Sequence, residues 1–353
     1  MNSGGRSTAT VRCRHCSTHL TVPAGERAIQ CTECCRVTRV RQCPSRLPVT
    51  RPAAAPMAFP RCTRGKKRAV LIGITYASMR RGRGCAALTG PINDVKFMRH
   101  LLCQRFGFSS DCILMLTDDQ KDPSRLPTKD NIRKAMRWLV QGCSYGDSMV
   151  FHFSGEGAQV PDDDCDEVDG NDEAICPMDS FQQGPILDDE INEALVRPLV
   201  HGAKLHAVVD ACHSATVLDL PFLCRRSRCG NWQWEDHRPR SGVCKGTSGG
   251  LAVLIAGYSD GKSKISATPE AYASVGAMTH SFIKAVECEP RGVTYGRLIT
   301  SMKAIMTNSG GRCSLQGPVA GAPVSKVANF SGVQEPNLSS SVLFDINCKP
   351  FAL

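Results

Sequence analysis

The chain contains no uninterrupted run of about 18 apolar residues, the length that a membrane-spanning helix requires. Its first residues, MNSGGRSTATVRCR, also lack the apolar stretch at the centre of a secretory signal peptide. We therefore expect neither a membrane span nor secretion, and we place the protein in the cytosol or the nucleus. In a reducing compartment, the 20 cysteines are expected to be free thiols, metal ligands or a nucleophile rather than a disulfide framework.

Acidic residues are scarce in the first 68 residues, which hold 14 Lys and Arg but only 2 Asp and Glu. The rest of the chain has 29 basic and 31 acidic residues, so the net charge of +10 originates in the N-terminal segment. A basic arm can bind nucleic acid, acidic proteins or an anionic membrane. Composition alone favours the simpler interpretation, which is a solvated linker without a nucleic-acid partner.

Two Cys-x2-Cys pairs are separated by 14 residues near the N-terminus: Cys13, Cys16, Cys31 and Cys34. This spacing is typical of a structural tetrahedral zinc site. Fewer than 40 residues cannot bury enough apolar surface to fold, so zinc binding would supply the folding energy. His15 and Cys35 are additional candidate ligands, and the alternative is a tail with four free thiols.

Residues 41–66 are rich in proline, at Pro44, Pro48, Pro52, Pro56 and Pro60. Prolines at this spacing forbid a helix and favour an extended, semi-rigid chain. We interpret the segment as a basic linker between a small module at residues 1–40 and a large domain at residues 67–353.

Apolar runs alternate with helical patterns through the large domain. Strands are expected at residues 68–74, 112–117, 147–153, 205–210 and 251–257. Helices are expected at 91–105, which opens with Pro91, and at 128–142, where Thr128 is the candidate N-cap. The alternation predicts an α/β fold with a mostly parallel sheet and helices on both faces. The long, polar and basic segment 222–248 is expected to be an exposed loop.

The apolar run LHAVV leads into Asp210-Ala211-Cys212-His213-Ser214. Parallel sheets keep their active sites where such strands end, so Cys212 is a candidate nucleophile. The strand at 147–153 leads into a glycine-rich turn, Ser154-Gly155-Glu156-Gly157. A thiol attacks as the thiolate and needs a nearby base, and Glu156 stands where a histidine would serve.

Four blocks carry a family resemblance: FHFSGEGAQ, VDGNDEAICPMD, ILDDEIN and DACHSATVLDLPF. They resemble, in the same order, blocks of type I plant metacaspases, the caspase-like cysteine endopeptidases of plants. The likeness extends over about residues 66–353. The cysteine-rich segment resembles the lesion-simulating-disease type of zinc finger that precedes the catalytic domain in that family and is regarded as a protein-interaction element. The departure is local, since the family turn reads Ser-Gly-His-Gly.

The resemblance implies a caspase-like domain in which Cys212 is the nucleophile and Glu156 takes the position of the histidine base. His152 and His213 are not expected to replace that base. The oxyanion hole would use the backbone N–H groups of Gly155 and Cys212, although a glycine pair is equally consistent with a tight turn.

The family cleaves after Arg or Lys, and its acidic pocket corresponds to Asp94 and Asp210, with Ser154 nearby. Two carboxylates suit a guanidinium or ammonium group. Asp94 taken alone could instead be a carboxylate at a helix N-terminus.

The resemblance also implies an activating calcium ion bound by four aspartates: Asp172, Asp188, Asp189 and Asp219. From the pattern alone, DDDCDEVDGNDE at 162–173 is a solvated acidic loop, because its spacing does not match an EF-hand.

Two functions remain open from the sequence. The first is a calcium-dependent Arg/Lys-specific cysteine endopeptidase, acting in proteolysis and programmed cell death but impaired by Glu156. The alternative is a non-catalytic binding or regulatory protein that uses the same pocket and the zinc finger for protein partners.

Overall fold

The computed structural model describes residues 9–40, 67–80, 87–162, 170–227, 230–239, 242, 244–258, 276–308 and 335–353. The predicted proline-rich linker at 41–66 lies outside these residues.

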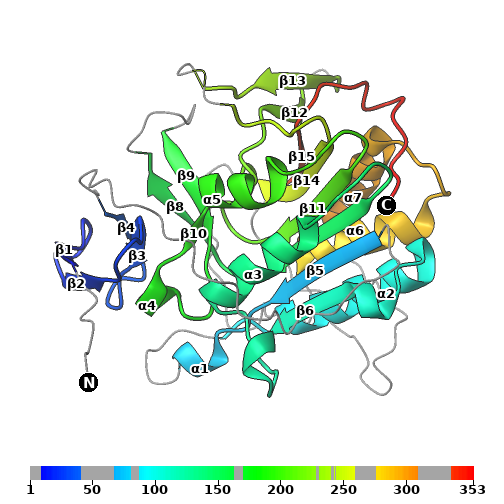
Figure 1. Ribbon diagram of the computed structural model, residues 1–353. Helices are drawn as coiled ribbons and strands as arrows, with labels where there is room; N and C mark the ends of the chain where they lie inside the picture. Colours follow the sequence, from blue (N-terminus) through cyan, green and yellow to red (C-terminus); the bar gives the residue numbers. More distant parts are fainter. Residues whose placement is uncertain are drawn as a thin grey trace.

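An eight-stranded sheet forms the centre of the protein, in the order β13-β12-β15-β14-β11-β7-β5-β6 (Figure 1). Its parallel strands are β5 (Lys67–Gly73), β6 (Ile113–Thr117), β7 (Ser148–Ser154), β11 (Lys204–Asp210) and β14 (Leu251–Tyr258). These five strands coincide with the five apolar runs. The three strands at one end of the sheet pair antiparallel: β12 (Phe222–Arg226), β13 (Trp232–Asp236) and β15 (Glu335–Ser340). The predicted α/β class with a mostly parallel sheet is confirmed.

Alternate residues of each central strand enter two separate cores. Val70 and Ile72 of β5 pack on one face with α3 (Lys129–Val140) and η3 (Asn192–Val196), whereas Leu71 packs on the other. That second face is covered by α2 (Pro91–Phe106), α6 (Ala277–Cys288) and α7 (Tyr295–Asn308). Burial on both faces explains why the strands are apolar at nearly every position rather than alternating with polar residues.

The two predicted helices form where the local signals place them. Thr128 caps α3, because its hydroxyl accepts a hydrogen bond from the Asn131 N–H at 3.3 Å. Helix α2 begins with Pro91 and ends at Gly107, whose φ of 69° closes the last turn. No helix in the described residues is long and apolar enough to cross a membrane.

The N-terminal strands form a small module beside the large domain (Figure 1). Two antiparallel pairs build it, β1 (Ala9–Arg12) with β2 (His19–Val22) and β3 (Ala28–Gln30) with β4 (Val37–Arg39). It lies next to a second small sheet, composed of β8 (Gly157–Pro161), β9 (Asn171–Ile175) and β10 (Ile186–Leu187). The remaining elements are short: α1 (Ala77–Arg80), η1 (Ser110–Cys112), η2 (Pro123–Arg125), α4 (Ser180–Gln183) and α5 (Asp188–Ile191).

The prediction of an exposed loop over residues 222–248 is wrong for its first half. Residues 222–226 and 232–236 pair antiparallel as β12 and β13, and β12 also pairs with β15. Trp232 and Trp234 of β13 pack against the second core, and Arg226 lies over the Trp232 ring at 6.0 Å. The aromatic residues explain the strand, because they supply apolar surface that the basic composition of the segment conceals.

Candidate active site

The register of β7 and β11 brings the two predicted site segments together. Asp210, the last residue of β11, pairs with Ser154, the last residue of β7. Cys212 follows two residues later and is exposed. A Cβ at Gly157 would lie 1.9 Å from the carbonyl oxygen of Cys212, so the turn packs directly against the cysteine. Glycine at position 157 is therefore required by the close approach of the two backbones.

The turn that holds Glu156 is fixed by Tyr76. The Tyr76 hydroxyl donates to the Cys176 carbonyl at 2.6 Å and accepts from the Glu156 N–H at 3.0 Å. The Cys176 N–H donates to the Glu156 carbonyl at 3.0 Å. Tyr76 is 3% exposed, so these bonds are shielded from water. The arrangement places residue 156 immediately before the glycine that contacts Cys212.

The electrostatic environment of Cys212 opposes thiolate formation. Although the side chain keeps contact with solvent, the surrounding protein raises the pKa of the Cys212 thiol above 9.0, and the nearby Asp210 carboxylate raises it further. An imidazolium at position 156 would have the opposite effect on the pKa, because a cation stabilises a thiolate. Glu156 offers a carboxylate instead.

Neither nearby histidine is placed to act as the base. His152 is fully buried, donates its Nδ1–H to the Val208 carbonyl at 2.9 Å, and has its pKa lowered to about 4 by burial. His213 has a left-handed backbone with φ of 52°, and its pKa is lowered by partial burial. Burial thus disfavours the imidazolium form of both histidines, and their exclusion as the base stays a prediction from the sequence.

The predicted substrate pocket residues converge at the start of α6. The Ser154 hydroxyl donates to Asp94 at 2.5 Å, and the Gly276 N–H donates to the same carboxylate at 2.8 Å. Asp210 accepts from the Thr279 N–H at 2.7 Å. A Cβ at Gly276 would lie 2.3 Å from an Asp210 oxygen and 2.9 Å from an Asp94 oxygen, so both carboxylates face one point.

Burial and mutual repulsion disfavour the ionised form of this pair of acids. Burial, followed by repulsion from Asp210, holds the pKa of Asp94 well above its usual range, and burial raises the pKa of Asp210. A bound guanidinium would reverse the repulsion and favour ionisation of both groups. The hydrogen bonds from the first turn of α6 also give both aspartates a structural role, as considered for Asp94 from the sequence.

The predicted oxyanion donor Gly155 is already engaged. Its N–H donates to the Asp210 carbonyl at 3.2 Å, which extends the ladder between β7 and β11. Gly157 is the glycine in contact with Cys212, and its pairing with Ile175 places it at a position whose N–H points away from the β9 ladder. The geometry therefore favours Gly157 over Gly155 as a neighbour of an oxyanion formed at Cys212.

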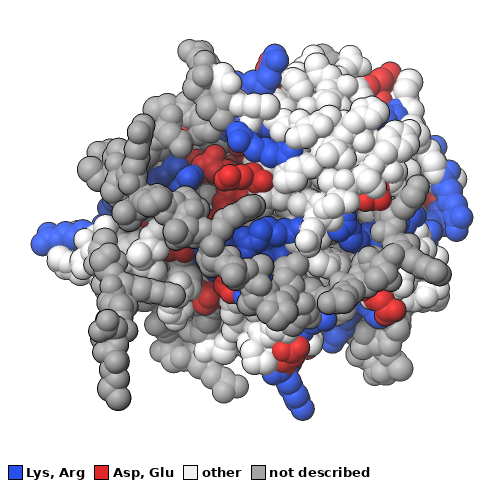
Figure 2. All heavy atoms as spheres, in the orientation of Figure 1, with Lys and Arg blue, Asp and Glu red and all other residues white. Residues whose placement is uncertain are grey.

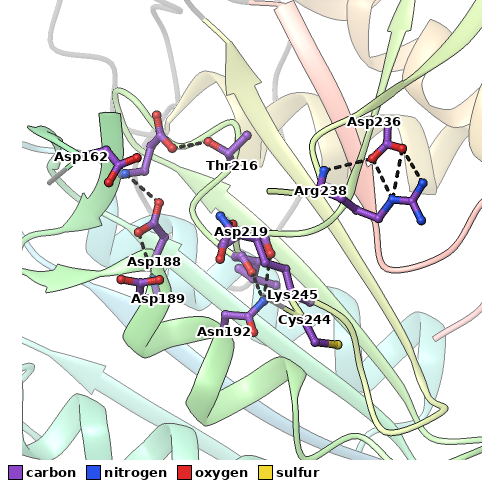
Figure 3. A network of polar contacts seen from close by, with 12 residues as sticks. Asp162, Asp188, Asp189, Asn192, Thr216, Asp219, Asp236, Arg238, Cys244 and Lys245 are labelled. Carbon is purple, nitrogen blue, oxygen red and sulfur yellow. Dashed lines mark hydrogen bonds and ion pairs between the residues drawn. The ribbon is translucent and has the colours of Figure 1, made fainter. Parts of the chain in front are cut away.

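The four aspartates predicted to bind calcium divide into two groups, and Figure 3 shows Asp188 and Asp189 of α5 apart from Asp219, which lies beside Lys245. Asp172 forms an ion pair with Arg39, and Asp189 lies 3.9 Å from the same guanidinium. Asp188 accepts hydrogen bonds from the N–H groups of Glu173 and Asp189 at 2.8 and 2.9 Å. Asp219 instead pairs with the buried Lys245 at 2.5 Å.

The four N-terminal cysteines have the geometry of a zinc site. All their sulfur atoms lie within 4.8 Å of one another, with Cys13–Cys34 at 3.6 Å and Cys16–Cys31 at 3.5 Å. A tetrahedron with Zn–S bonds of about 2.3 Å has sulfur atoms about 3.8 Å apart. In the described part of the chain, this is the one group of at least three His, Cys, Asp or Glu side chains that converges in this way. His15 and Cys35 are exposed and stand outside it.

Sequence reasoning missed three residues that shape the site: Tyr76, Arg39 and Lys245. Tyr76 acts through a hydroxyl 80 residues from Glu156 in the chain, and its one local signal is its place directly after the first strand. Arg39 and Lys245 lie in basic segments where nothing local distinguishes a buried cation from a solvated one.

The comparisons with known proteins agree with the fold. A sequence model of the family described as metacaspase, peptidase C14 domain, matches residues 67–221. Metacaspase-1 of Arabidopsis thaliana is 46% identical, covering 97% of this chain and 96% of that protein. Metacaspase-3 of the same plant is 49% identical, covering 82% of this chain and 76% of that protein.

Among solved structures, the crystal structure of protein GSU0716 from Geobacter sulfurreducens matches with a TM-score of 0.50. It has 18% sequence identity and covers 81% of this chain and 97% of that chain. At this identity the likeness concerns the fold alone.

Replacing Tyr76 by Phe should lower the free energy of unfolding by about 1–3 kcal/mol, because the change leaves a buried carbonyl and a buried N–H without their partner. Urea denaturation followed by circular dichroism measures this. Tyr145→Phe is the matched control, since Tyr145 is 73% exposed and should change little. Equal stability of the two variants would show that the Tyr76 hydroxyl does not hold the turn.

Proposed function

The chain belongs to the metacaspase family of cysteine peptidases, and on that premise we propose that it is an endopeptidase for bonds after Arg or Lys whose catalysis is weak. The same proposal includes activation by calcium, a role in proteolysis including programmed cell death, and location in the cytosol or nucleus. The small N-terminal module that carries the four cysteines, called the zinc module below, would bind protein partners.

The observation that carries the proposal is the position of Glu156. Glu156 immediately precedes Gly157, the residue that contacts Cys212. It takes the position at which the family has its histidine. A catalytic imidazole accepts the thiol proton, pairs with the thiolate as a cation, and then protonates the leaving amine. Glu156 would do none of these well, because a carboxylate is a weaker base than an imidazole and cannot pair with the thiolate as a cation, while the pKa of the Cys212 thiol is already raised.

The size of the defect follows from ordinary pKa values. Glutamate has a reference pKa of about 4.3 and histidine one of about 6.5, so proton transfer from the thiol is less favourable by roughly 3 kcal/mol. That difference corresponds to at least about a 100-fold loss of rate. Cys212, Ser154, Asp94 and Asp210 otherwise keep the arrangement that the activity requires.

A second candidate function is binding without cleavage. It is favoured by the contrast between the two halves of the site. The acid pair at the start of α6 faces one point and suits an Arg or Lys side chain, whereas the Cys212 thiol lacks a base. A protein of this kind would retain peptides with Arg or Lys and release them uncut.

Glu156→His should increase kcat/KM for a peptide with Arg before the scissile bond by at least about 100-fold, because the imidazole restores the proton acceptor and the cationic partner of the thiolate. A fluorogenic peptide assay with calcium present measures this. Cys212→Ala on that background should abolish the gain. If the unaltered protein cleaves as fast as Glu156→His, another group is the base and the impairment is disproved.

The alkylation of Cys212 by iodoacetamide should be slow at neutral pH and should accelerate only in more alkaline solution than that of an ordinary thiol, because burial and the Asp210 carboxylate raise the pKa of Cys212. Glu156→His should shift the acceleration to lower pH. Mass spectrometry of the Cys212 peptide follows the reaction, and the exposed Cys288 on the same chain serves as the internal reference. Rapid alkylation of Cys212 at pH 7 in the unaltered protein would contradict the assignment.

Asp94→Asn should weaken binding of an Arg-containing peptide to the Cys212→Ala protein by at least about ten-fold, because it removes one of two carboxylates that face the cation. Binding should strengthen as pH rises, because the cation favours the ionised acids and their pKa values are raised. Calorimetry measures both effects. The exposed Asp111→Asn is the control, and an Asp94→Asn variant that binds equally well would exclude this pocket.

A further inference from the structure

The zinc module inserts a buried arginine into the acidic cluster of the large domain. Arg39, on β4, has a side chain only 7% exposed. It pairs with Asp172, whose side chain is 1% exposed, and lies 3.9 Å from both Asp162 and Asp189. A cation buried this deeply is stable only among compensating anions, so Arg39 and the aspartates hold each other in place.

The rest of the module is shaped to keep Arg39 there. Ala28 and Val37 of the module form one small core with Val160, Ala174 and Leu187 of the large domain. The module side chain of Gln30 accepts a hydrogen bond from Ser180 at 2.6 Å. The contact is therefore a packed interface with an apolar centre, rather than a pair of exposed charges.

A second ion-pair group anchors the module away from the aspartates. Glu26 pairs with Lys129 and, at 3.2 Å, with Arg133. Lys129 and Arg133 both come from α3, whereas the aspartates around Arg39 come from β9, α5 and the end of β8. The interface thus has two polar anchors of opposite sign, and each can be altered separately.

The carboxylates around Arg39 form an acidic cluster of Asp162, Asp172 and Asp189. Figure 2 shows acidic side chains gathered over β9 and α5 beside basic side chains of the module. Arg27 adds a further contact to Asp189 at 3.7 Å. Clustered carboxylate oxygens are the ligands that a hard divalent cation prefers. The guanidinium of Arg39 therefore occupies oxygens that such a cation would need.

We propose that the docked zinc module and a divalent cation compete for Asp172 and Asp189, so that cation binding releases the module and docking excludes the cation. Arg39 is then a counter-ion supplied by the same chain, and the docked module opposes calcium activation. This inference rests on the calcium activation proposed above. By linkage, docking weakens cation binding by the same factor by which cation binding weakens docking.

The test compares calcium binding by the zinc-loaded full chain and three variants, using calorimetry with calcium alone. Arg39→Gln should bind calcium at least about ten-fold more tightly, because a competing charge is removed. Glu26→Gln should also bind more tightly, although Glu26 contacts α3 and not the aspartates, because it weakens docking. Arg36→Gln, an exposed change in the same module, should bind as the unaltered protein does.

Hydrogen exchange supplies the second measurement and does not depend on any variant folding well. Calcium should accelerate exchange of backbone amides in β4 and β8, whose residues meet at the interface, while exchange in the central strand β7 stays unchanged.

The outcomes separate the two proposals. If calcium binds but neither Glu26→Gln nor hydrogen exchange responds, competition with docking is disproved while calcium activation stands. If Arg39→Gln alone responds, Arg39 acts as a local charge and release of the module is disproved. If calcium binds to none of the proteins, both the competition and the proposed calcium activation fail.

Discussion

The register between β7 and β11 is the constraint on which the rest of the site depends. Pairing of Ser154 with Asp210 places the Glu156 turn beside Cys212 and brings two carboxylates to the start of α6. A shift of β7 by one residue would turn Phe151 out of the core that it shares with Val209 and carry His152 into it. The apolar packing of the sheet therefore fixes the geometry of the polar groups at its edge, which have no comparable means to position themselves.

Much of the fold could be predicted, because its signals are local. The five central strands are buried on both faces and read as apolar runs, and Thr128 and Pro91 mark helix starts that the structure confirms. The hairpin β12–β13 could not be predicted from its composition, since Trp232 and Trp234 act through contacts with a core built from distant residues. The same limit applies to Tyr76, whose hydroxyl fixes a turn 80 residues away.

The residues of the candidate site could be predicted from the sequence better than the contacts between them. Asp94, Ser154 and Asp210 do converge, as the family resemblance implied. Gly155 is not a suitable oxyanion donor, because its N–H continues the hydrogen-bond ladder at the end of β7 and donates to the Asp210 carbonyl. The grouping of the four aspartates could not be corrected from the sequence, because it does not reveal the protein cations that accompany them. The acidic residues of a site can be identified from the sequence, whereas their counter-ions, Arg39 and Lys245, can be identified only from the fold.

Two sites in this chain solve the problem of buried negative charge in different ways. At Asp172 and Asp219, buried basic side chains from other segments supply the compensation, and an added metal must displace them. At Asp94 and Asp210 the compensation comes from α6 amides and from raised pKa values, so the pair remains receptive to an external cation. Cys212 lies beside this second site, where an additional negative charge is most unfavourable. Asp210 already raises the pKa of the Cys212 thiol, and a cation in the neighbouring turn would counter that effect. Glu156 supplies no cation at that position, which is the physical basis of the impairment that we propose.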